Sequence, residues 1–137
     1  MMAGQTSKGI EMYAENTWAE SGDFLFVTGQ ERSAVIGTLL VEGGLRFAHA
    51  ESGGQALELL DTEPWKVLVA DAILPDMDGI ELTRAALEKH AGLLVILGVT
   101  DPPEDFGKKA AMAGVAGIVY TPYKPDKLFP LLWFLMQ

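Results

Sequence analysis

An aspartate at the end of an apolar run is the residue best placed to do chemistry in this sequence. Asp71 follows the apolar segment 67–70 and precedes an apolar stretch that ends at Pro75. A carboxylate at the mouth of a hydrophobic sheet loses hydration free energy unless a ligand or a hydrogen bond satisfies it. The residues alone leave two interpretations open: Asp71 belongs to a functional site, or it caps the turn that follows a strand.

The composition narrows the classes of chemistry that remain. The 137 residues are 49% hydrophobic and 21% charged, which is typical of a single globular domain. The absence of cysteine excludes disulfides, zinc–thiolate sites and thiol nucleophiles. A net charge of −9 disfavours nucleic acid and anionic lipid as direct partners, because phosphate groups are bound by lysine and arginine.

The start of the chain and its apolar runs bear on targeting. No apolar run reaches the ~18 residues that a membrane-spanning helix needs. Residues 1–7 lack the basic and then apolar layout of a signal peptide. We therefore expect a cytoplasmic protein with no membrane contact. Residues 1–22 are polar and predict an N-terminal leader, either a short docked helix or a disordered segment, ahead of one domain at 23–137.

From residue 23 onward, short apolar runs alternate with segments of helical spacing. The runs predict strands, and the spaced segments predict helices. Strands are expected at 24–27, 45–50, 67–70, 93–99 and 115–120, and helices at 34–41, 53–60, 80–89, 104–112 and 128–136. Strands that alternate with helices form βαβ units. The pattern therefore predicts an α/β domain with a doubly wound parallel sheet and helices on both faces.

The predicted strand ends are the candidate site positions, because ligands of open parallel sheets bind beyond the carboxyl ends of the strands. These positions are Thr28 and Gly29, Asp71, Val99 and Thr100, and Tyr120 and Thr121. Asp71 is the only carboxylate among them. Three nearby acids are interpreted as solvated loop charge, because their spacing does not match a calcium loop. These acids are Asp76, Asp78 and Glu81.

The segment around Asp71 resembles the phosphoacceptor segment of bacterial response-regulator receiver domains. The shared features are an apolar strand, the aspartate, Pro75 four residues later, and then Met77-Asp78-Gly79. The likeness runs without gaps from about residue 23 to residue 135. It implies a flavodoxin-like five-stranded sheet in the order 2-1-3-4-5, and a signalling domain of a two-component phosphorelay rather than an enzyme. It also implies that a sensor histidine kinase phosphorylates Asp71 with the help of Mg²⁺.

The sequence departs from the receiver pattern at most positions of the expected pocket. The family carries an acid pair after the first strand, a hydroxyl at the end of the fourth and a lysine after the fifth. This sequence has, in that order, Thr28 and Gly29, Val99 followed by Thr100, and Thr121. The resemblance leaves Asp71 and the backbone carbonyl of Ile73 as metal ligands, so we expect Mg²⁺ binding to be weak or absent. Lys124 takes the place of the family's lysine only if the alignment with the family includes an insertion before it.

Two functions remain open on these residues. One is a receiver that is phosphorylated at Asp71. The other is a pseudo-receiver, the same fold used as a phosphorylation-independent interaction or dimerisation module. A small enzyme or nucleotide-binding protein is disfavoured, because the sequence has no acid–base pair, no nucleophile with its base and no glycine-rich phosphate loop. The expected partner is a sensor histidine kinase or another signalling protein.

The C-terminal segment is expected to carry an interface. Leucines at 128, 131, 132 and 135 form a stripe that can bury against the sheet. Large apolar side chains on its other faces are Phe129, Trp133, Phe134 and Met136. Exposed side chains of this kind favour a protein contact, and receivers commonly dimerise through this helix. A homodimer is therefore expected, with contact to the leader or to further chain as the alternatives.

Overall fold

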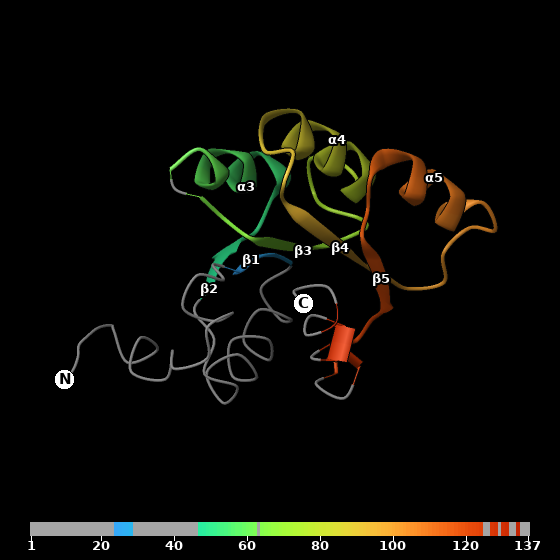
Figure 1. The fold of residues 1–137 in the computed structure, drawn as a ribbon. Coiled ribbons are helices and arrows are strands. Elements are labelled where there is room, and N and C mark those ends of the chain that lie inside the picture. Colours follow the sequence, from blue (N-terminus) through green and yellow to red (C-terminus); the bar gives the residue numbers. More distant parts are fainter. Residues whose placement is uncertain are drawn as a thin grey trace.

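The computed structural model describes residues 24–28, 47–62, 64–124, 127–128, 130–131 and 134. Five strands in this part of the chain form one parallel sheet in the order β2-β1-β3-β4-β5 (Figure 1). They are β1 (Phe24–Val27), β2 (Phe47–Ala50), β3 (Val67–Asp71), β4 (Leu94–Val99) and β5 (Gly117–Tyr120). The predicted sheet and its strand order are therefore confirmed. The predicted leader at 1–22 and the helix at 34–41 lie outside the described residues.

Helical segments cover both faces of this sheet. The helices α3 (Gly53–Leu60), α4 (Gly79–Lys89) and α5 (Phe106–Ala113) lie together on one face (Figure 1). Helical residues near the C-terminus, Leu128 and Leu131 among them, pack against the core of the other face. The domain is thus doubly wound, as the alternation of strands and helices predicts.

The short apolar runs of the sequence correspond to strands that are buried on both faces. Successive side chains of a strand point to opposite sides of the sheet. Phe24 and Phe26 of β1 pack with Leu128 on one face. Leu25 and Val27 pack on the other face, in the core that α3 and α4 cover. All residues of β1 and β3 are buried, so β1 and residues 67–70 of β3 are continuous apolar sequence rather than an alternating pattern.

The start of α5 differs from the predicted boundary. The helix begins at Phe106 instead of residue 104. Pro102 and Pro103 precede it, and the Phe106 N–H donates to the Pro103 carbonyl at 3.0 Å. This bond spans three residues, as in a turn, whereas the four-residue spacing of an α-helix is seen in the bond from the Lys109 N–H to the Asp105 carbonyl at 3.1 Å. Residues 104 and 105 therefore form a turn before the helix.

The end of α5 explains why β5 begins at Gly117 and not at residue 115, where the sequence predicts it. Gly114 follows the helix with φ of 100°, in the left-handed region that favours glycine. The Val115 N–H then donates to the Ala110 carbonyl at 3.0 Å, which closes the last turn. Residue 115 therefore belongs to the helix termination, and the strand begins at Gly117.

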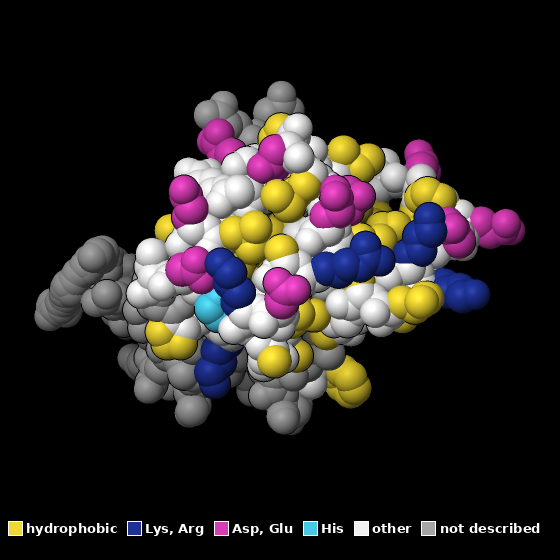
Figure 2. All heavy atoms as spheres, turned by 90° about the horizontal axis from the view of Figure 1, so that it is seen from above, with side chains coloured by type: hydrophobic (Ala, Val, Ile, Leu, Met, Phe, Trp, Pro, Cys, Tyr) yellow, Lys and Arg dark blue, Asp and Glu magenta, His cyan; other side chains and the backbone are white. Residues whose placement is uncertain are grey.

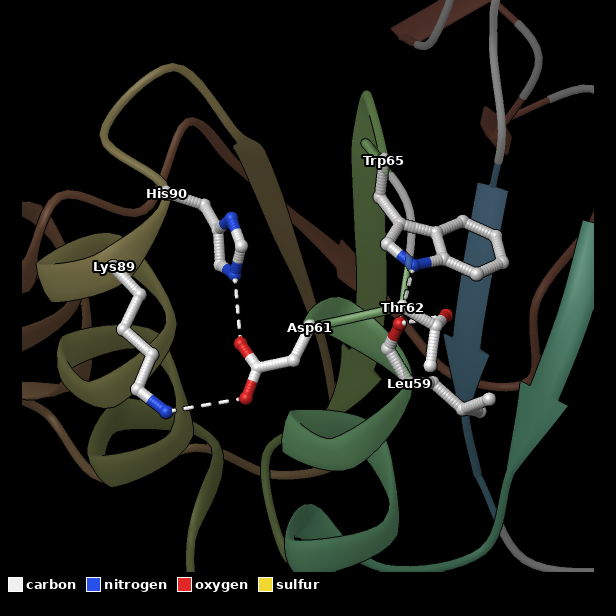
Figure 3. A network of polar contacts seen from close by, with 6 residues as sticks. All are labelled: Leu59, Asp61, Thr62, Trp65, Lys89 and His90. Atoms are coloured by element: carbon white, nitrogen blue, oxygen red, sulfur yellow. Dashed lines mark hydrogen bonds and ion pairs between the residues drawn. The ribbon is translucent and has the colours of Figure 1, made fainter.

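A polar network joins the C-terminal ends of α3 and α4 (Figure 3). Asp61 directly follows α3; its carboxylate accepts a hydrogen bond from Lys89 at 3.3 Å and lies 3.4 Å from Nε2 of His90. The hydrogen bond from Lys89 holds the pKa of Asp61 below its usual value, and His90 acts in the same direction. These contacts offset the repulsion between a carboxylate and the negative end of a helix. Nearby, the Trp65 indole donates to the Leu59 carbonyl at 2.7 Å.

α4 begins with a reciprocal capping box. The Glu81 N–H donates to Asp78 Oδ1 at 2.8 Å, and the Asp78 N–H donates to Glu81 Oε1 at 3.1 Å. Both residues are exposed, but each satisfies an amide that the helix leaves without a partner. The prediction that these acids are solvated is confirmed, but they also cap α4, a role that the prediction did not include. The spacing Asp-x-x-Glu before an amphipathic segment was the sequence signal.

We predict that Leu82→Ala lowers the free energy of unfolding by about 2–5 kcal/mol. Leu82 is fully buried in the core beneath α4, so truncation removes apolar contacts and leaves a cavity. Urea unfolding followed by circular dichroism measures the change. Met112→Ala is the control, because Met112 of α5 is 77% exposed and its loss is expected to change stability by no more than about 0.5 kcal/mol. Equal losses in the two variants would contradict the assigned core.

Candidate functional site

Asp71 is the last residue of β3, the central strand of the sheet. β3 lies between β1 and β4, and Asp71 pairs with Gly98 in the ladder. The Ala72 N–H donates to the Gly98 carbonyl at 2.8 Å, which extends the pairing past the strand end. Asp71 is only 7% exposed. A buried carboxylate therefore stands at the edge of the sheet where folds of this class bind ligands.

Two hydroxyl groups donate hydrogen bonds to the Asp71 carboxylate. Thr28, which follows β1, donates from Oγ1 to Oδ2 at 2.8 Å. Tyr123, which follows β5, donates from its phenol to Oδ1 at 2.7 Å. Both donors are buried. Hydrogen bonds to an ionised acceptor are stronger than bonds between neutral groups, so they offset the cost of burying the carboxylate. Each carboxylate oxygen is thus engaged within the protein.

Tyr123 is the site residue that sequence reasoning missed. Its ring lies edge-on to Phe26, with 6.3 Å between the ring centroids and 89° between the planes. The ring also passes over Gly98, where a Cβ would overlap the phenol. The peptide bond before Pro122 is cis. A glycine within the apolar strand β4, together with an aromatic residue just after β5, was the available sequence signal.

The structure brings together two of the other predicted positions. The hydroxyls of Thr100 and Thr121 are hydrogen-bonded to each other, across the ends of β4 and β5. Thr121 also donates to the Val99 carbonyl at 3.3 Å, whereas the Val99 side chain is buried. Lys124 is exposed, and its carbonyl accepts the first amides of the C-terminal helical residues. The second position of the lost acid pair, Gly29, lies outside the described residues.

The loop between β3 and α4 is fixed at its base, yet it presents an apolar side chain to solvent. Ile73 and Asp78 form an antiparallel bridge, and the Gly79 N–H donates to the Ala72 carbonyl at 2.7 Å. A Cβ at Gly79 would come within 2.9 Å of the Asp71 carbonyl oxygen, so this close approach requires glycine. Ile73 is nevertheless 83% exposed.

Asp76 ties the same loop to the N-terminus of α3. Its Oδ1 accepts the Gly53 N–H and its Oδ2 accepts the Gly54 N–H, each at 2.9 Å. Amides in the first turn of a helix have no partner within the helix, so the carboxylate satisfies them. The bonds from Gly54 and Gly53 hold the pKa of Asp76 below its usual value. Asp76 is thus an exposed loop carboxylate, as predicted, that also caps α3.

The described residues around Asp71 do not supply the grouped carboxylates that a Mg²⁺ ion prefers. Mg²⁺ takes oxygen ligands in octahedral geometry and is bound by carboxylates together with water and phosphate. Within the ranges described above, no three His, Cys, Asp or Glu side chains are grouped so that they could hold a metal ion. Thr28 stands where the resemblance implies an acid, and its hydroxyl donates to Asp71.

The C-terminal residues predicted to form an interface are described only in part. Phe134 is helical and 74% exposed. Leu128 and Leu131, two leucines of the predicted stripe, pack against the sheet. The other predicted interface positions, Phe129, Trp133 and Met136, lie outside what the structure describes.

Comparison with known proteins identifies the class of this fold and site. The family model described as "Response regulator receiver domain" matches residues 29–132. The chemotaxis protein CheY of Pseudomonas aeruginosa is 37% identical over 97 residues, which cover 69% of this chain and 78% of that protein. A CheY-like receiver domain from Methanospirillum hungatei superposes with a TM-score of 0.76 at 21% identity, covering 84% of this chain and 93% of that one. The chain therefore belongs to the response-regulator receiver family.

Membership in this family defines a receiver domain of two-component signalling systems. The chain is also 43% identical, over 57 residues, to the response regulator receiver protein CpdR of Brucella abortus. It matches 48% of the length of CpdR and 21% of the transcriptional regulator NtrC of Klebsiella pneumoniae. Every helix in the described ranges is too short or too polar to span a bilayer.

We predict that Tyr123→Phe lowers the free energy of unfolding by about 1–3 kcal/mol. The variant keeps the ring against Phe26 but removes the hydroxyl that donates to the buried Asp71 carboxylate. Chemical unfolding of the two proteins side by side measures the loss. Tyr120→Phe is the matched control, since Tyr120 is 70% exposed. Identical stabilities of Tyr123→Phe and Tyr120→Phe would show that the buried bond contributes nothing.

We predict that Asp76→Asn makes stability less dependent on pH. The lowered pKa of Asp76 means that its ionised form stabilises the fold. This contribution is complete above the ordinary pKa of 3.8 and is lost as the pH falls through the lower pKa of the folded state. The stability gap between wild type and variant should be widest near neutral pH and should narrow below about pH 4.

Urea titrations at a series of pH values measure this gap. Glu88→Gln, which removes an exposed carboxylate from α4, is the control for general loss of negative charge. A gap for Asp76→Asn that keeps its neutral-pH size in acid would argue against the cap.

Proposed function

We propose that the chain is an atypical receiver, with Asp71 at the phosphoacceptor position, in which Mg²⁺-dependent phosphorylation is weak or absent. In this pseudo-receiver function, the domain transmits its signal through protein contacts that do not require a phosphoryl group. The supporting observation is the engagement of both Asp71 oxygens by Thr28 and Tyr123. Phosphorylation of either oxygen would turn it into a bridging ester oxygen, which is a weaker acceptor for the buried hydroxyl that donates to it.

The joint substitutions around Asp71 support the same proposal. A catalytic metal commonly contributes several kcal/mol of charge stabilisation, and a loss of roughly 4 kcal/mol slows a reaction about a thousandfold. Thr28 and Gly29 offer no side-chain carboxylate for such a metal, and Thr121 offers no cation for the phosphoryl oxygens. Since a phosphoryl group brings nearly two negative charges, Asp71 would carry it without the usual compensation.

A phosphorylated receiver is the second candidate, and one observation favours it. Asp71 and Thr100 line the same open pocket, and Thr100 is hydrogen-bonded to Thr121. Hydroxyl groups at these positions can donate to phosphoryl oxygens in place of the family's hydroxyl and lysine. This second candidate function requires that the neutral hydroxyl groups take over the role of the charged groups that the family's pocket contains.

The proposal also includes the cellular location of the domain and its partners. We expect it to act in the cytoplasm as residues 23–137, with a sensor histidine kinase or another signalling protein as its partner. A homodimer through the C-terminal helix is supported by the 74% exposure of Phe134.

We predict that Mg²⁺ and beryllofluoride, added together, leave the amide NMR shifts around Asp71 unchanged at millimolar Mg²⁺. Beryllofluoride mimics a phosphoryl group on an aspartate, and positions 28, 29 and 121 do not carry the acids and the lysine that compensate its charge in the family. The measurement is a titration of the isotope-labelled full chain. Saturable shifts in the wild type would refute the pseudo-receiver and favour the second candidate.

A variant that restores the family's acid pair and lysine is the positive control. It combines Thr28→Asp, Gly29→Asp and Thr121→Lys. We expect this variant to be less stable without Mg²⁺, because the acid at position 28 then lies beside the Asp71 carboxylate, and to be stabilised by Mg²⁺. It should also show saturable shifts with beryllofluoride. A variant that gains stability with Mg²⁺ while the wild type does not would assign the difference to these three positions.

A further inference from the structure

An open pocket of about 880 Å³ lies between the β3–α4 loop and the β4–α5 loop. Ile80 of α4 and Phe106 of α5 line it and also pack against the core beneath these helices, so its floor is continuous with the hydrophobic core. Ile73 lines the rim and is 83% exposed. Figure 2, which looks onto α3, α4 and α5, shows exposed hydrophobic side chains among acidic and basic ones on this face. A large exposed apolar side chain beside an apolar floor marks a contact surface.

Both walls of the pocket are held by the fold. On one side, the Leu74 N–H donates to the Met77 carbonyl at 3.1 Å, and Asp76 ties the loop to α3. On the other side, Pro102 and Pro103 stiffen the loop that leads into α5. A pocket with fixed walls loses little conformational entropy when a partner binds. The exposure of Ile73 is therefore a property of the folded domain and not of a loosely held loop.

The charge around this pocket is unbalanced. Its lining includes four carboxylates and one ammonium group, from Asp71, Asp78, Asp101, Asp105 and Lys109. The one ammonium group is paired with Asp105 at 3.2 Å. Asp101 is exposed in the loop after β4, with φ of 47°. The acidic rim complements a cation, and the chain's net charge of −9 adds attraction at long range.

We propose that this pocket binds a segment of a partner protein in which an apolar side chain is flanked by lysine or arginine. The apolar side chain covers Ile73 and fills the floor at Phe106, while the cation meets the acidic rim at Asp101. A small molecule would be largely enclosed by its pocket, but Ile73 stands open at the rim, which suits a chain lying across the surface. The proposal goes beyond the proposed function, since it holds whether or not Asp71 is phosphorylated.

The test begins with a displayed library of random linear peptides, selected on the full chain and counter-selected on Ile73→Ser. We expect the enriched peptides to share an apolar residue next to lysine or arginine. Each is then synthesised, and its affinity is measured by fluorescence anisotropy. Ile73→Ser should weaken binding about tenfold, which corresponds to about 1.4 kcal/mol. Asp101→Asn should weaken it roughly threefold and flatten its salt dependence, because asparagine tolerates the same backbone conformation but carries no charge.

Matched controls separate binding in the pocket from non-specific binding to exposed apolar or acidic side chains. Met112→Ser removes another highly exposed apolar side chain from the same side of the domain, and Glu88→Gln removes an acid from α4 outside the pocket lining. Both should bind the peptides as the wild type does. Unchanged NMR shifts away from residue 73 verify that Ile73→Ser is folded. Failure to enrich any peptide, a consensus without basic residues, or equal binding by Ile73→Ser and Met112→Ser would overturn the proposal.

Discussion

The burial of one carboxylate is the constraint around which the edge of the sheet is built. Asp71 ends the central strand with 7% of its surface exposed, and a charged group there costs several kcal/mol unless hydrogen bonds replace its hydration. The fold brings in the hydroxyls of Thr28 and Tyr123 from the ends of β1 and β5. Both hydroxyl donors are neutral, and they replace part of the hydration that the carboxylate loses on burial. The Asp71 side chain thereby links three strand ends of the sheet.

The substitutions in the pocket share one effect: each removes a charged side chain that the receiver pattern places near the aspartate. The receiver pattern places an acid pair and a lysine around the aspartate, and this sequence lacks all three at the matching positions. Acids beside Asp71 would repel it unless a metal ion lay between them. Thr28 instead supplies a donor. Under the proposed function, the pocket has exchanged a set of groups that compensate a phosphoryl group for a set that stabilises a permanently buried carboxylate.

The contacts that hold the β3–α4 loop connect the Asp71 site to the surface of the domain. Asp76 satisfies two amides at the start of α3, and the capping box of Asp78 begins α4 directly after the loop. Gly79 permits the close approach of the helix to the backbone of Asp71. With its base held in this way, the loop keeps Ile73 exposed. The same contacts that fix the site therefore also shape the pocket proposed to bind a partner.

The sequence by itself determined the parallel sheet, its strand order through the family resemblance, and the place of Asp71 at a strand end. A strand that is buried on both faces of the sheet needs an apolar residue at almost every position. A continuous apolar run in the sequence therefore predicts such a strand. Only the tertiary structure decided the partners of Asp71 and Asp76. Tyr123 is 52 residues from Asp71, and Gly53 is 23 residues from Asp76. Contacts over such separations depend on how strand ends meet, and local periodicity carries no information about that meeting.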